Sequence, residues 1–265
     1  MKRTLALVGL TALACLWGIA QSPDRVVVPA RNSSRPRVLN ATATHGSITV
    51  KTHAGRDVIV ETPASARYRQ RMEQSVDGLH RIDSPARGLS VEEEDNVITV
   101  RASTTGPENL VITVPVDTSL HLKSTHGNVE ADGVRGEVEA TSTHGTINLT
   151  NISGNVVAST TNGSVKVSMN RVDPSKPMSF SSVNGSLDVT LPADTKANLK
   201  LKAVRGSVWS DFDMKLTGSQ PVTSPGGDNG KFKIDFDRTM YATINGGGVE
   251  ASFYTVNGRI MIRKK

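Results

Sequence analysis

The chain has 265 residues, a single cysteine and a formal net charge of +6 at pH 7, with both signs of charge interspersed along it. Its lysines and arginines do not gather into a stripe, which argues against binding to nucleic acid. The cysteine lies at position 15, in a segment that we expect to be removed, so the mature chain is predicted to have no disulfide, thiolate metal site or thiol nucleophile.

The first 20 residues have the composition of a secretory signal peptide. Two basic residues precede an apolar run, Leu5 to Ala20, and a polar segment follows it. Small residues at Gly18 and Ala20 predict cleavage after Ala20, with an uncleaved anchor or lipid attachment at Cys15 as alternatives. No other segment is long and apolar enough to span a bilayer. We therefore expect an exported protein that is periplasmic, on the cell surface or extracellular.

The rest of the chain divides into a short linker and one β domain. Residues 21–37 are rich in proline, arginine and serine, and we expect a flexible linker there. Residues 38–265 are predicted to form the β domain, with strands at 97–101 and 110–116. The segment 217–230 is rich in proline and glycine and is predicted to be a loop between later strands.

A short unit recurs along this domain. A glycine follows His, Asn or another residue, and a strand of alternating apolar and polar residues comes after it. Between Gly127 and Gly163 a glycine falls at every ninth position, and the His-Gly or Asn-Gly corners lie 18 residues apart. Glycine tolerates the positive φ of a sharp corner, so each unit is predicted to be a turn plus a strand. The predicted turn glycines are Gly46, Gly127, Gly136, Gly145, Gly154, Gly163, Gly185, Gly206 and Gly258.

This fixed period predicts an all-β fold, and within that class a single-stranded parallel β-helix, or β-solenoid, with about 18 residues per coil in its regular part. Stacked coils need a fixed period because each corner must lie above the corner of the coil below. An antiparallel barrel is the alternative, since Asn-Gly also marks tight hairpins, but hairpin sheets require no such period. A helical domain is excluded, because the strands are rich in Val, Ile and Thr.

Several segments follow one another in a characteristic order. They are Val111–Thr118 before the regular repeats, then Val189–Asp194, Asn245–Gly248 and Thr255–Ile260. In this order they resemble the bacterial "putative adhesin" β-solenoid family of unknown function, over about residues 38–265. The resemblance implies a parallel β-helix on an exported or membrane-associated protein, and it brings no catalytic residues with it.

The clearest candidates for ligand contact are Trp209, Asp211 and Asp213. Strand alternation places all three on an outer face, where the indole and the carboxylates could contact a glycan. Together with Asp235 and Asp237 they could also supply the paired carboxylates of a glycan-cleaving enzyme. Alternatively, the aspartates are only the polar half of the alternation and Trp209 packs under a neighbouring loop. We predict no catalytic residue.

His45, His126 and His144 share a Thr-His-Gly context. Since 18 residues separate the last two, we expect their rings to stack about 5 Å apart at a solvent-facing corner. Two imidazoles so placed lack the third ligand and the supporting carboxylate of a zinc or copper site. The corners also lack the Gly-Gly-x-Gly-x-Asp pattern of calcium-binding solenoids. We therefore predict no metal site and no cofactor.

These features favour a non-enzymatic exported cell-envelope or surface protein that acts as an adhesin-like interaction scaffold. Its partner is unknown, with envelope proteins and polysaccharides as the expected classes. The alternative function is that of a glycan-binding or glycan-processing β-helix that uses the surface around Trp209. No phosphate-binding loop, dinucleotide fingerprint or Ser-His-Asp arrangement stands out in the sequence.

Overall fold

A computed structural model describes residues 25–31, 35–63, 75–76, 79–80, 88–102, 109–217, 222–224, 233–235 and 239–265. The predicted signal peptide, residues 1–20, lies outside them and stays a prediction. The described residues are all strand, turn or irregular segment with no helix, which confirms the predicted all-β class. None of them forms a helix that could cross a membrane.

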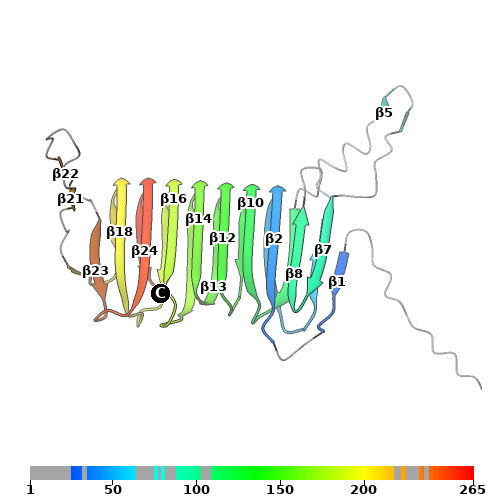
Figure 1. Cartoon of the computed structure of the whole chain (residues 1–265), viewed down its shortest axis with the longest axis horizontal. Coiled ribbons are helices and arrows are strands. Elements are labelled where there is room, and N and C mark those ends of the chain that lie inside the picture. Colours follow the sequence, from blue (N-terminus) through cyan, green and yellow to red (C-terminus); the bar gives the residue numbers. More distant parts are fainter. Residues whose placement is uncertain are drawn as a thin grey trace, which may run out of the picture.

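Two large sheets run along the long axis of the molecule (Figure 1). In spatial order the eleven-stranded sheet contains β20 (Lys215–Leu216), β23 (Met240–Ile244), β18 (Ala197–Arg205), β24 (Val249–Asn257), β16 (Met178–Asn184), β14 (Val156–Asn162), β12 (Val138–His144), β10 (Ser119–His126), β2 (Val38–His45), β8 (Val97–Ala102) and β7 (Leu89–Glu94). The ten-stranded sheet contains β1 (Arg25–Val28), β4 (Val58–Glu61), β9 (Asn109–Pro115), β3 (Ser47–His53), β11 (Val129–Asp132), β13 (Ile147–Gly154), β15 (Val165–Val172), β17 (Leu187–Leu191), β25 (Ile260–Lys264) and β19 (Val208–Ser210). Two small antiparallel pairs stand apart, β5 (Ser75–Val76) with β6 (Leu79–His80) and β21 (Val222–Ser224) with β22 (Lys233–Asp235).

From β8 to β19 the chain alternates between the two sheets, and each coil gives one strand to each. In the regular part the strands pair in parallel, and Leu120 of β10 lies opposite Val138 of β12, which is 18 residues later. The coil from β12 to β14 has the same length, since Ala140 lies opposite Ala158. The coil from β14 to β16 is longer, because Ser159 of β14 lies opposite Ser181 of β16, at a separation of 22 residues. Strands near both ends of the stack pair antiparallel instead.

The coils do not stack in chain order. The coil of β2 and β3 lies between that of β8 and β9 and that of β10 and β11. At the other end, the coil of β24 and β25 lies between that of β16 and β17 and that of β18 and β19. The fold is therefore a stack of two mostly parallel sheets, and a single-stranded β-helix with about 18 residues per coil is not confirmed for the whole domain.

Apolar side chains from both sheets fill the space between them. Inward positions alternate with outward ones along each strand, as in the pattern BeBiBee of β14, and the inward side chains are fully buried Val, Ile, Leu and Ala. Towards the C-terminal end the core includes Phe180 and Phe253, whose rings lie 4.9 Å apart. Burial of each such aliphatic side chain contributes about 1.5–3 kcal/mol, so the stack is stabilised by its continuous core.

Two predicted segments differ from expectation. The flexible linker predicted at 21–37 does not hold for Arg25–Val28, which forms β1 and pairs with β4. Three consecutive valines favour a strand, and Val28 is buried against the core. The loop predicted at 217–230 likewise includes the short strand β21.

Candidate functional site

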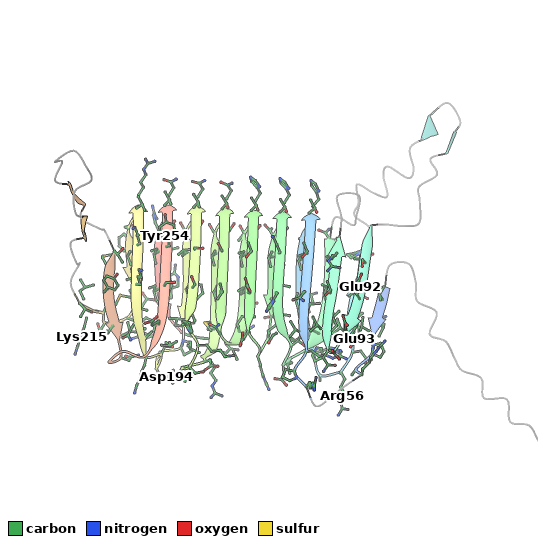
Figure 2. The ribbon with its side chains drawn as sticks, viewed as in Figure 1. Arg56, Glu92, Glu93, Asp194, Lys215 and Tyr254 are labelled. Carbon is green, nitrogen blue, oxygen red and sulfur yellow. The ribbon has the colours of Figure 1, made fainter. Side chains whose placement is uncertain are left out.

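One edge of the stack carries a row of polar side chains, one from each of seven strands. The strand register aligns these residues at the ends of neighbouring strands, in the order His45, His126, His144, Asn162, Asn184, Asn257 and Arg205. All seven are exposed. Side chains project beyond the ends of these strands along the top edge in Figure 2. We call this set the corner row.

The histidines of the corner row stack face to face. The rings of His126 and His144 lie 4.9 Å apart with planes 2° from parallel, as predicted. Because β2 lies beside β10, the ring of His45 extends the stack and lies 5.1 Å from the ring of His126. This third member of the stack had not been predicted. The asparagines continue the row, since Asn184 Nδ2 donates to Asn162 Oδ1 at 2.8 Å and Asn257 Nδ2 donates to Asn184 Oδ1 at 2.7 Å.

A buried row of hydroxyls lies behind the corner row. Two residues before each His or Asn of the row, except His45, which has Ala43 at that position, a buried Ser or Thr donates a hydrogen bond to the carbonyl of the corner glycine on the neighbouring coil. The pairs are Ser124 with Gly46 (3.2 Å), Ser142 with Gly127 (3.1 Å), Thr160 with Gly145 (3.0 Å), Ser182 with Gly163 (2.8 Å) and Thr255 with Gly185 (2.9 Å). This row was not predicted from the sequence, although the repeated Ser or Thr two residues before His-Gly or Asn-Gly could have indicated it.

The corner glycines are required by close packing more than by backbone conformation. Of the nine predicted turn glycines, only Gly46 and Gly154 have positive φ. At Gly145 an added Cβ would lie 2.0 Å from the carbonyl oxygen of Gly127. The same close approach to a neighbouring glycine carbonyl recurs at Gly127, Gly163, Gly185, Gly206 and Gly258. The predicted reason, tolerance of positive φ, is therefore wrong for most of these positions.

The stacked histidines do not form a metal centre in the described arrangement. Parallel rings about 5 Å apart do not bring two nitrogens to one ion with bonds of about 2.0–2.1 Å. Within the described residues there is no group of three His, Cys, Asp or Glu side chains placed to hold a metal ion. The arrangement instead presents imidazole edges and amides to solvent at a regular spacing.

The predicted Trp209 surface lies at one end of the ten-stranded sheet, on the edge strand β19. The Trp209 side chain is 62% exposed, and its Nε1–H donates a hydrogen bond to Ser207 Oγ at 2.8 Å. This fixed indole borders a hollow of about 320 Å³. The lining residues are Trp209, Ser210, Asp211, Arg259, Met261, Ile262 and Arg263.

One of the two arginines that line this hollow, Arg263, is hydrogen-bonded to a carboxylate. Arg263 donates from Nε to Asp188 Oδ1 at 2.8 Å and from a terminal nitrogen to Oδ2 at 3.3 Å. This hydrogen bonding raises the pKa of Arg263 above its ordinary value, with a smaller contribution from the charge of Asp211. Asp213 is not among the lining residues, so the hollow receives only one of the two predicted carboxylates.

The other predicted carboxylates cannot be placed beside Trp209. The side chain of Asp235 and the whole of Asp237 lie outside the described residues. The described part of the chain therefore gives no carboxylate pair around this hollow, and it offers an indole face with one aspartate and two arginines.

Residues 39–230 match the Toastrack DUF4097 family, which covers well over half of the chain. The chain belongs to this family. No curated protein matches it at a significant level. The Toastrack match includes Trp209 and Asp211, whereas Arg259 and Arg263, which complete the hollow, lie beyond its end on β25 and the turn before it.

Two solved structures are similar to this Toastrack protein. A putative cell adhesion protein from Clostridium sporogenes has 10% sequence identity and a TM-score of 0.41, and the match covers 91% of this chain and 99% of that one. A putative adhesin from Bacteroides fragilis has 11% identity and a TM-score of 0.39, covering 92% and 98%.

Proposed function

We propose that the protein is a non-enzymatic exported cell-envelope or surface protein that acts as an adhesin-like interaction scaffold. The observation that carries this proposal is the corner row, in which the strand register repeats an exposed polar side chain once per coil. In the regular part, we infer, the two sheets are the walls of one β-solenoid with about 18 residues per coil.

A row of this kind suits an extended partner. Neighbouring strands of a sheet lie about 4.8 Å apart, so the row offers hydrogen-bonding groups at that interval along one edge. Each exposed contact is weak by itself, but linked contacts with one long partner add through a high effective concentration. A polysaccharide or an extended segment of an envelope protein would meet this requirement.

Glycan binding at Trp209 is the second candidate function. It is favoured by the exposed, hydrogen-bonded indole beside Asp211, Arg259 and Arg263 in one hollow. An aromatic face packs against the apolar face of a sugar while charged groups bind its hydroxyls. Glycan binding without cleavage fits this hollow better, because hydrolysis requires two carboxylates and Asp211 alone lines it.

The test is retention of residues 21–265 on immobilised cell-wall and extracellular polysaccharides, together with binding to whole cell envelopes. We expect retention on at least one surface. Loss of polysaccharide retention in a Trp209→Ala variant would assign glycan binding to the hollow. The matched control is Tyr254→Ala, which removes an exposed aromatic side chain from the eleven-stranded sheet. If the protein bound neither polysaccharides nor envelopes, the scaffold proposal would be wrong.

A further inference from the structure

The edge opposite the corner row carries two arginines on either side of a serine. Ser153 lies opposite Arg171 in the register of β13 and β15. Its backbone N–H donates to Val134 O at 2.8 Å, which places Ser153 beside Arg135 on the preceding coil. The two arginines therefore lie two strand spacings apart, about 10 Å at the backbone, with Ser153 between them.

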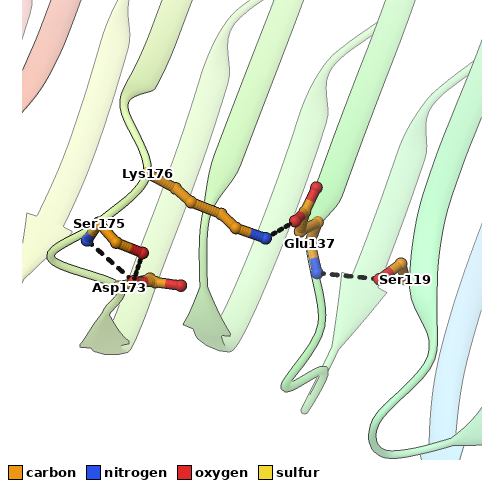
Figure 3. Close-up of polar contacts among 5 residues, drawn as sticks. All are labelled: Ser119, Glu137, Asp173, Ser175 and Lys176. Carbon is orange, nitrogen blue, oxygen red and sulfur yellow. Dashed lines mark hydrogen bonds and ion pairs between the residues drawn. The ribbon is translucent and has the colours of Figure 1, made fainter. Parts of the chain in front are cut away.

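A loop specific to one coil overhangs this edge. The long coil between β14 and β16 contains the additional segment 173–177, and two contacts hold it (Figure 3). Asp173 Oδ1 accepts hydrogen bonds from Ser175 N–H at 2.9 Å and from Ser175 Oγ at 2.7 Å. Lys176 forms an ion pair with Glu137, which precedes β12 two coils away. The loop is thus fixed across the neighbouring corners.

Under this loop lies a hollow of about 430 Å³. It is lined by Arg135, Ser153, Gly154, Arg171, Asp173 and Pro174. Within the described part of the chain, neither Arg135 nor Arg171 forms an ion pair, and the nearby Glu137 is paired with Lys176. The one carboxylate in the lining belongs to Asp173. Hydrogen bonds from the hydroxyl and the backbone of Ser175 hold its pKa below its ordinary value, with a smaller contribution from the charge of Arg171.

We propose that this hollow binds a tetrahedral oxyanion, the phosphate or sulfate group of a small ion or of an ester, between Arg135 and Arg171. Each guanidinium presents parallel N–H donors that fit two oxygens of an oxyanion. A carboxylate has only two oxygens, which one arginine satisfies, whereas a phosphate or sulfate has enough to accept from both arginines and from the Ser153 hydroxyl. This site is separate from the Trp209 hollow and does not depend on glycan binding there.

The test is to titrate the protein separately with inorganic phosphate, inorganic sulfate, glycerol 3-phosphate and acetate at constant ionic strength. The NMR signals of the arginine Nε–H groups report binding. We expect saturable shifts of Arg135 and Arg171 with phosphate or sulfate. Equal or tighter binding of glycerol 3-phosphate would identify an ester as the source, and binding of the inorganic ions alone would identify a free anion. Absence of saturation, or equally tight binding of acetate, would overturn the proposal.

Variants show whether both arginines act together. Arg135→Gln and Arg171→Gln should each lower the affinity for the anion about tenfold, since each substitution removes a charged bidentate donor. The control is Arg56→Gln, which removes an exposed arginine from the turn before β4, outside the hollow and the corner row, and should leave the affinity unchanged. Full affinity in either hollow variant would contradict a bridged anion.

A variant with a higher affinity excludes misfolding as the explanation for weaker anion binding in the two arginine variants. Asp173→Asn keeps the Oδ1 acceptor for Ser175 and removes the only negative charge of the lining. We expect it to bind phosphate or sulfate about threefold to tenfold more tightly, because like charge no longer opposes the ligand. Unchanged or weaker binding would place the anion elsewhere.

Discussion

At five corners of the row, three neighbouring residue types have separate roles. At the end of β12, Ser142 donates a hydrogen bond to Gly127 of the preceding coil, His144 projects to solvent, and Gly145 lets the backbones approach. The sequence predicted the glycines and the outward His or Asn, because their spacing is periodic. It did not predict the hydroxyls, because a serine on a strand has no local feature that separates a buried donor from a surface residue.

Substitution of a corner glycine should be strongly destabilising. In Gly145→Ala the new methyl group would lie 2.0 Å from the backbone oxygen of Gly127, and backbone cannot move aside as a side chain can. We expect a loss of about 3 kcal/mol in the free energy of unfolding, measured by urea denaturation. Gly55→Ala is the control, since its nearest contacts are ring atoms of His53, a side chain that can rotate. Equal losses in both variants would show that close coil contact is not the cause.

Among the structural elements, the histidine stack was partly predictable. The 18-residue separation of His126 and His144 implied adjacent coils, and the structure confirms their stacking. The position of His45 was not predictable, because no fixed period connects it to the others and its place depends on how β2 inserts into the sheet. Strand alternation was also a poor guide beyond β19, which ends at Ser210 before the two aspartates.

For the whole molecule, the sequence predicted the class of fold but not the order of the coils. All corners carry nearly the same residues, so any coil is chemically suited to lie beside any other. After β3 the chain places β8 on one side of β2 and then β10 on the other, and after β19 it returns so that β24 lies between β16 and β18. A fixed period identifies adjacent coils in the regular part, and it carries no information about which coils the end coils contact.

Removal of the C-terminal strands should therefore prevent folding of the far end of the stack. Deletion of residues 249–265 removes β24 and β25, which lie between β16 and β18 and between β17 and β19. We expect the deletion to abolish the cooperative unfolding transition, as measured by circular dichroism. Deletion of residues 222–235 is the control, because β21 and β22 pair only with each other among the described strands. Cooperative unfolding after the first deletion would show that the interior position of β24 is not needed.

The interior position of both terminal coils also restricts how the stack can change in evolution. In an ordinary repeat protein, duplication of the last unit adds one more layer at an open end. Here the last coil in the chain already has a neighbour on each side, so an appended copy would find no free layer beside it. Insertion of a coil in the middle, between β10 and β16, is the route that remains. The stack can therefore lengthen at its centre, while the arrangement of the coils at its two ends stays constant.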